Sequence, residues 1–169
     1  MANPLYGQNQ DDNQLFNARA GVIINSAART LLASESGSTV LHNSAATAIT
    51  LPAAKAGLNF KIILGIEATS GCNILTASNA DCFFGTIPIY CSDTTEQAGV
   101  AQQLAYATAI AAPASYDAMK LVAATATIGG CAGEVIELVC VSSVAWHVNI
   151  PAHMTSANDP GTCALIVAR

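Results

Sequence analysis

The amino-acid sequence predicts an all-β protein: a single β-sandwich or jelly-roll-like domain with an extended N-terminal arm. Two observations lead to this fold class. The apolar segments have the length of strands, and clusters of Gly, Pro, Asn and Ser interrupt them every eight to twelve residues or so, a spacing typical of β-sandwiches. The chain of 169 residues is long enough for one domain with a core and too short for two comfortable ones.

The predicted arm comprises residues 1–25. This stretch is rich in Asn, Gln and Asp, and its apolar residues are confined to short groups such as Leu15-Phe16 and Val22–Ile24. So little apolar content does not support independent folding, and arms of this kind become ordered on a neighbour. The β-sandwich domain is then expected to span residues 26–169.

The first half of the domain reads as a series of short strands. In the segment that starts near Phe60, the residues Phe60, Ile62 and Leu64 alternate with more polar neighbours, so these three side chains are expected to face the core. Gly85 and Pro88 interrupt the last segment, which indicates an edge strand or a bulge. The predicted strands are Thr30–Ala33, Thr39–His42, Ala48–Leu51, the segment from Phe60, Asn73–Ala77 and Cys82–Tyr90.

The second half begins with a long excursion at about residues 88–117. Its Asp93–Ala112 portion is rich in Ala, Gln and Thr and carries no strong strand signal, and the chain as a whole shows no internal repeat. Glu134–Val141 is apolar on both faces except for two glutamates, which predicts a strand that is sandwiched or packs its outer face on another subunit. The predicted strands here are Lys120–Ile128, Glu134–Val141, Ala145–Ile150 and Cys163–Val167.

Trp146 is the only tryptophan of the chain, and its same-face neighbours on the predicted strand, Val144 and Val148, are apolar. This pattern places the indole in the core. A buried indole N–H normally finds a hydrogen-bond acceptor, so one is expected nearby.

The composition indicates extensive contact with partners. Apolar residues make up 52% of the chain and charged residues only 10%, against roughly 25% charged in ordinary soluble domains. Because soluble proteins seldom expose large apolar patches, part of this surface is expected to be buried against other subunits. The net charge of −5 disfavours direct nucleic-acid binding. No apolar run is long enough for a transmembrane helix, and the first residues do not resemble a signal peptide.

No arrangement suited to catalysis, metal binding or cofactor binding is evident. His42, His147 and His153 fit no metal-binding spacing and are expected to be structural or surface residues. Glu134 and Glu137 would lie on opposite faces of a strand, which spoils them as an acid/base pair. The glycine cluster Gly129–Gly133 lacks the context of a phosphate loop and predicts a hairpin. We therefore expect no catalytic residue, no cofactor and no metal.

The six cysteines form no C-x-x-C pair and no zinc-site spacing. We expect most of them to be reduced and buried as small hydrophobic residues. Disulfides are the alternative, with Cys82 and Cys91 as the first pair to consider.

Five segments matter as a set: Thr39–Asn43, Ala48–Leu64, Asp81–Gly85, Gly133–Cys140 and Trp146–Val148. Together they resemble small structural proteins of tailed bacteriophages, in particular capsid decoration (cement) proteins. The resemblance covers roughly residues 29–86 and 120–150. It implies a homotrimer on the three-fold positions of the capsid exterior, in contact with the major capsid protein, in a virion assembled in the cytoplasm of a bacterial host.

The resulting hypothesis is a non-enzymatic protein whose arm crosses neighbouring capsomers and staples the capsid, without nucleic-acid or membrane binding. The candidate capsid contacts are apolar residues of the arm: Leu5, Tyr6, Leu15 and Phe16. The alternative is a host-recognition, glycan-binding module of a tail fibre or spike, with Tyr90, Tyr106 and Tyr116 as candidate contacts. A hydrolase on a sandwich scaffold is a third option.

Overall fold

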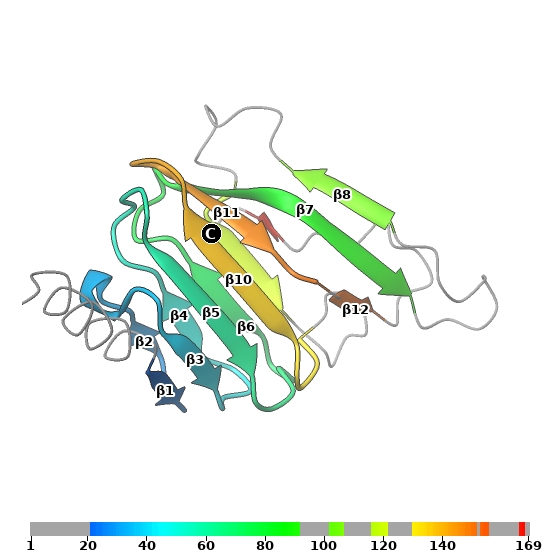
Figure 1. The fold of residues 1–169 in the computed structure, drawn as a ribbon. Helices are drawn as coiled ribbons and strands as arrows, with labels where there is room; N and C mark the ends of the chain where they lie inside the picture. The colour runs from blue at the N-terminus through cyan, green and yellow to red at the C-terminus, as the bar shows by residue number, and fades with distance from the viewer. Residues whose placement is uncertain are drawn as a thin grey trace, which may run out of the picture.

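The computed structural model describes residues 21–91, 102–106, 116–121, 130–151, 153–155 and 166–167. The described chain is all-β, as predicted, and its strands form two mixed sheets (Figure 1). The larger sheet contains β1 (Val22–Asn25), β3 (Thr39–His42), β5 (Asn59–Leu64), β7 (Cys82–Cys91), β8 (Gln102–Tyr106), β10 (Val135–Cys140), β11 (Ala145–Asn149) and β12 (His153–Thr155). The smaller sheet contains β2 (Arg29–Thr30), β4 (Ala48–Thr50), β6 (Cys72–Leu75), β9 (Ala118–Leu121) and β13 (Ile166–Val167). The helical structure of the described part is one 3-10 turn, η1 (Ala33–Glu35).

The larger sheet has the order β1-β3-β5-β10-β11-β7-β12, with β8 paired to β7, and the smaller sheet has the order β13-β9-β6-β4-β2. From β1 to β6 the chain crosses to the other sheet after every strand. Each return to a sheet therefore runs in the same direction as before, and the pairs β1–β3, β3–β5, β2–β4 and β4–β6 are all parallel. This pairing corrects the jelly-roll-like expectation, because jelly rolls are built from antiparallel strands.

The corners between the sheets stack as regularly as the strands do. At one corner the amide of Asn43 donates to the carbonyl of Asn25 at 2.6 Å, and at the opposite corner the amide of Leu31 donates to the carbonyl of Thr50 at 2.8 Å. Residues 22–75 thus form a coil of three stacked turns. The structure also points to an internal repeat that we did not expect. The β1–β2 corner and the β3–β4 corner, which stack on each other, carry the same Asn-Ser-Ala-Ala sequence, at 25–28 and 43–46.

The remaining strands close the two sheets. β10 is antiparallel to both β5 and β11, and β9 is antiparallel to β6. β7 is long and changes partners along its length: it pairs with β11, then with β8, then with β12. The expected edge or bulge at Gly85 corresponds to the first of these changes. In Figure 1, β7, β8 and β12 extend away from the body of the two sheets.

Some predicted boundaries shift. The last four residues of the predicted arm are β1, and residues 1–20 lie outside the described residues. The excursion at 88–117 contains the end of β7 and all of β8, a strand that the sequence did not predict. β9 and β10, on either side of the glycine cluster, belong to different sheets and do not form a hairpin with each other, whereas residues 122–129 lie outside the described residues.

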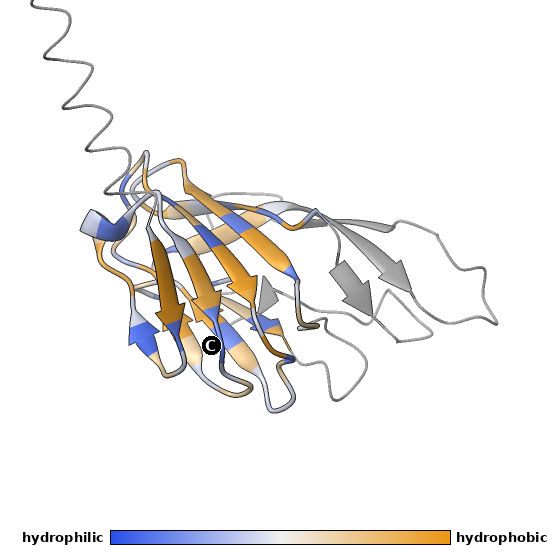
Figure 2. Cartoon of the chain, turned by 60° about the horizontal axis from the view of Figure 1, so that its bottom comes forward, coloured by the Kyte–Doolittle hydropathy of each residue, from blue (hydrophilic) through white to orange (hydrophobic). Residues whose placement is uncertain are grey.

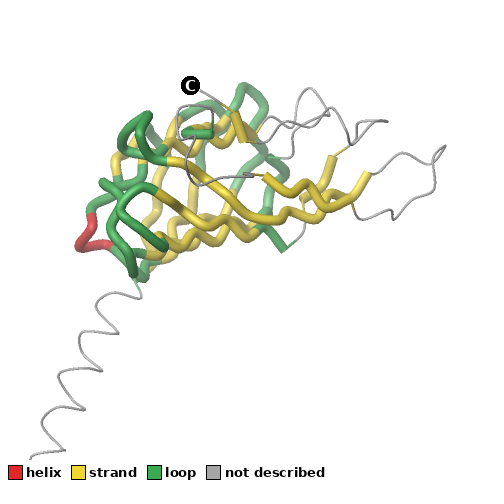
Figure 3. Tube along the Cα trace, turned by 90° about the horizontal axis from the view of Figure 1, so that it is seen from above, coloured by secondary structure: helices red, strands yellow, loops and turns green. Residues whose placement is uncertain are grey.

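The inward faces of the two sheets pack on each other in two layers around a common hydrophobic core (Figure 3). Phe60, Ile62 and Leu64 belong to this core, which confirms the predicted alternation. Trp146 is fully buried, as predicted, and its ring centroid lies 6.2 Å from that of Phe60. The expected acceptor is not found among the described residues, where the indole Nε1 has no hydrogen-bond partner.

Candidate interaction surface

The outward face of the larger sheet carries an uninterrupted apolar row. Strand alternation turns every second side chain outward, and the register of the pairing aligns these side chains across neighbouring strands. The row runs over β1, β3, β5 and β10 and consists of Ile24, Leu41, Ile63 and Val135. It is most exposed at the sheet edge, where 71% of Ile24 and 64% of its strand neighbour Val22 are accessible.

A second row on the same face contains its charges. Lys61 on β5 lies opposite Glu137 on β10, with Nζ 3.9 Å from Oε1, and Asn149 on β11 donates to the other carboxylate oxygen at 2.9 Å. Lys61 and Glu137 are the only Lys, Arg, Asp or Glu side chains that face outward on β1, β3, β5, β10 and β11. An exposed pair of this kind adds little stability, but it leaves the face without net charge.

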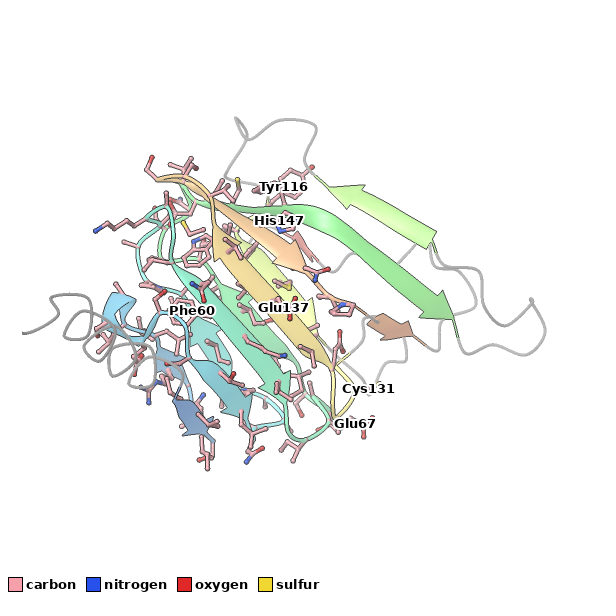
Figure 4. All side chains as sticks on the ribbon, viewed as in Figure 1. Phe60, Glu67, Tyr116, Cys131, Glu137 and His147 are labelled. Carbon is pink, nitrogen blue, oxygen red and sulfur yellow. The ribbon has the colours of Figure 1, made fainter. Side chains whose placement is uncertain are left out.

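A third row includes a shallow hollow. Val139 on β10 is 44% exposed and lies between Asn59 of β5 and His147 of β11 in the register. The His147 ring in turn packs edge-on against Phe84, with 5.3 Å between centroids. Figure 4 shows Glu137 on β10 and His147 on the neighbouring β11. The hollow has a volume of about 330 Å³ and is lined by Gly37, Asn59, Phe60, Lys61, Glu137, Leu138 and Val139.

The two sheets differ in their outward faces. Outward positions of the smaller sheet are mainly polar or small: Thr30, Ala48, Thr50, Asn73, Leu75 and Lys120. Figure 2 shows orange hydrophobic segments along the strands with blue hydrophilic bands between them, and the register places the apolar Ile24, Leu41, Ile63 and Val135 on the outward face of the larger sheet. The outward face of the larger sheet is therefore the better candidate for contact with another protein.

The sequence predicted this face only in part. We expected Glu134–Val141 to be sandwiched or to pack its outer face on another subunit, and the structure places the exposed Val139 on that outer face. The apolar row was missed, because its members come from four strands and only the register brings them into line. The predicted capsid contacts Leu5, Tyr6, Leu15 and Phe16 lie outside the described residues.

Of the three tyrosines considered for glycan binding, the structure describes the side chain of Tyr116 alone. Tyr116 is half-buried and packs against the hydrophobic core. The side chains of Tyr90 and Tyr106 lie outside the described residues, although their backbones belong to β7 and β8.

His42 is a core residue. Its side chain is fully buried, with Nδ1 3.0 Å from the amide nitrogen of Asn25 and Nε2 3.4 Å from the hydroxyl of Thr47. Burial lowers the pKa of this histidine, partly offset by a hydrogen bond to Thr47. The neutral imidazole therefore links β3 to β1 through its hydrogen bond with Asn25. His147 faces outward, and the side chain of His153 lies outside the described residues.

The side chains of four cysteines are described, and all four are free thiols: Cys72, Cys82, Cys131 and Cys140. The alternative disulfide between Cys82 and Cys91 is therefore not formed. Burial, assisted by the carboxylate of Glu134, raises the pKa of Cys72 to about 12. Cys131 is exposed beside Glu67 (Figure 4), and desolvation together with the carboxylates of Glu134 and Glu67 raises its pKa as well. Thiols with a raised pKa are poor nucleophiles at neutral pH.

Glu134 and Glu137 point to opposite sides of the sheet, as predicted. Glu134 is buried, and its Oε2 accepts a hydrogen bond from the amide of Gly130 at 2.7 Å, which holds the turn before β10. Glu137 points outward beside Lys61. Each carboxylate thus has a structural partner of its own.

Within the described ranges, no three His, Cys, Asp or Glu side chains lie close enough together to hold a metal ion. None of the helical structure described there has the length and hydropathy of a membrane span. In comparisons with known proteins, no family model matches this chain, and neither a curated protein nor a solved structure is significantly similar to it.

Proposed function

We propose that this chain is a non-enzymatic virion structural protein that binds the outer surface of a phage capsid and stabilises it by bridging neighbouring major capsid protein subunits. The observation that supports this proposal most directly is the outward apolar row Ile24, Leu41, Ile63 and Val135 on the larger sheet, beside which the charges of Lys61 and Glu137 compensate each other. Exposed apolar surface of this kind marks sites of protein contact. A chain with only 10% charged residues fits a component that works inside an assembly.

In this proposal the two layers form a β-sandwich that acts as a stiff platform. Its first six strands are joined by backbone hydrogen bonds both within the sheets and at their corners, as between Leu51 and Leu75. The arm, residues 1–21, leaves the platform at β1, which is the edge strand of the larger sheet. Leu5, Tyr6, Leu15 and Phe16 are the proposed contacts with the neighbouring capsid subunits.

The mechanism would be additive. Each copy needs only a few kcal/mol of net binding energy, because many copies on one lattice must release before the shell opens. Location on the capsid exterior, after assembly in the bacterial cytoplasm, belongs to the same proposal.

The experiment compares capsids with and without this chain. Genome release against temperature is measured for particles that carry the protein, for particles assembled without it, and for the latter after purified protein is added back. Decorated and reconstituted particles should release their genomes at a higher temperature than bare ones. Coincident curves for all three samples would contradict the stapling function.

One observation favours the alternative, a glycan-binding module of a tail fibre or spike. The hollow of about 330 Å³ brings the polar side chains of Asn59, Lys61 and Glu137 beside the apolar Val139. Such a mixture suits sugar hydroxyls and ring carbons, but the hollow has no exposed aromatic ring to stack on a sugar. Screening the purified chain against a glycan array distinguishes the two functions.

A further inference from the structure

We propose that copies of this chain associate through the outward face of the larger sheet, with Val22 and Ile24 of one copy seated in the hollow over β5 and β10 of the next. This inference deepens the proposed function, on which it rests for its biological setting, by assigning the surface through which the expected trimer forms. The contact itself is argued from the geometry and charges of the described residues.

The first half of the contact is a projecting edge. Among the described residues, β1 is the edge strand of the larger sheet and pairs with β3 alone, so its other side has no strand partner there. Val22 and Ile24 are the two most exposed large apolar side chains of the described chain, at 64% and 71%. A Cβ placed on Gly21, immediately before β1, would meet no atom within 4 Å. The edge is therefore open to a neighbour.

The second half is the hollow. Its rim includes Gly37, which has no side chain and a φ of 90°, and its lining includes Val139, which is nearly half exposed. Phe60 and Leu138 are buried beneath it. A cavity of about 330 Å³ lies at the lower end of the range of ligand sites and suits a small number of aliphatic side chains.

Charge favours a second copy as the occupant. Two chains of net charge −5 repel each other except where their surfaces are locally neutral. The hollow meets this condition, because its only charged groups, Lys61 and Glu137, lie 3.9 Å apart and compensate each other. The edge at β1 carries no charged side chain at all.

The edge at β1 and the hollow over β5 and β10 lie apart on the same face of one copy. β1 lies two strands from β5 and three from β10, which corresponds to about 10 to 14 Å at the usual strand spacing. Because the edge and the hollow are different parts of one face, the edge of one copy contacts the hollow of the next. If the contact is reciprocal it gives a two-fold dimer, and if it is heterologous it generates a closed ring when the rotation closes, of which a trimer is one example.

The test uses the purified full-length chain without capsids. The parent, Ile24→Glu, Val139→Lys and the double variant Ile24→Glu/Val139→Lys are compared by sedimentation velocity over a range of concentrations. Thr30→Glu is the matched control, because Thr30 is also exposed on an edge strand but belongs to the smaller sheet. Circular dichroism establishes that each variant is folded, and Val22→Ser replaces any variant that is not.

We expect the parent and the control to form the same oligomer, and each single variant to associate at least about tenfold more weakly, a loss of 1.4 kcal/mol. The double variant should recover association, because the introduced carboxylate of one copy meets the introduced ammonium group of the next. A parent that stays monomeric at every concentration, single variants that associate like the parent, or a double variant that fails to recover would each overturn the inference. None of these results decides capsid stapling, which the genome-release experiment measures separately.

Discussion

Asn25 and His42 are joined across the parallel strands β1 and β3, with the side-chain amide nitrogen Nδ2 of Asn25 3.0 Å from Nδ1 of the buried imidazole. The same amide nitrogen also donates to the carbonyl of Ala27 at 2.7 Å. Since an amide nitrogen only donates, Nδ1 of His42 must be the acceptor and its proton must be on Nε2, which points to Thr47. The first corner of the coil thus depends on a neutral histidine.

The first prediction concerns pH. Burial holds the pKa of His42 below its ordinary value of 6.5, so the unfolded chain takes up a proton at a higher pH than the folded chain does. The contribution of His42 to the free energy of unfolding is therefore complete above about pH 6.5 and is lost as the pH falls from there towards the folded pKa. Urea unfolding of the parent and of His42→Gln at several pH values between 5 and 8, about the range in which histidine titrates, should show the steeper acid loss in the parent. His147→Gln, on the outward face, should keep the slope of the parent, and equal slopes for all three proteins would refute the prediction.

The second prediction concerns the core. Replacing Trp146 by Ala should lower the free energy of unfolding by about 3 to 5 kcal/mol, because the indole is fully buried against Phe60. Trp146→Phe should cost less, since it keeps an aromatic ring and removes an N–H that has no acceptor among the described residues. Denaturant midpoints give both values, with His147→Ala on the opposite face of β11 as control. A parent-like midpoint for Trp146→Ala would show that the packing of this ring is not what stabilises the fold.

The third prediction separates the arm from the first strand. A chain that begins at residue 21 retains β1 and should unfold at the same urea concentration as the parent while binding capsids more weakly. A chain that begins at residue 26 loses β1 and Asn25, and the unpaired imidazole of His42 should cost about 1 to 3 kcal/mol. Urea titration and cosedimentation with bare capsids measure the two effects. Unchanged capsid binding by the shorter deletion would argue against the arm as the capsid contact.

The fourth prediction concerns the point where β7 changes partners. A Cβ at Gly85 would lie 2.1 Å from the carbonyl oxygen of Val148, and both groups belong to backbone that cannot easily yield. Gly85→Ala should therefore destabilise the chain by about 1 to 3 kcal/mol, the usual cost of overpacking. Gly21→Ala, where a Cβ meets nothing within 4 Å, is the control for thermal unfolding of both variants. Equal melting temperatures for Gly85→Ala and Gly21→Ala would contradict the prediction, because they would mean that the backbones of β7 and β11 can move apart without loss of stability.

Local patterns in the sequence predicted most of the strands and the two faces of β5, but they missed β1, β8 and β12. The alternation at Phe60, Ile62 and Leu64 correctly predicted which side chains enter the core, because side chains in a strand point to opposite faces in turn. The burial of Trp146 followed from its apolar neighbours in the same way. β8 was missed because Asp93–Ala112 is dominated by Ala and Gln, which have weak strand preference, and the pairing of β8 with β7 overrides that local preference.

The sequence by itself determined the all-β class, most of the strands and the low charge that favours contact with partners. Only the tertiary structure decided that β1, β3 and β5 run parallel, that Cys82 is a free thiol, and that Ile24, Leu41, Ile63 and Val135 line up as one outward row. The physical reason is that side-chain alternation depends on residues next to each other in the chain. Strand order and register depend instead on which distant strands share hydrogen bonds, and no local pattern specifies those partners.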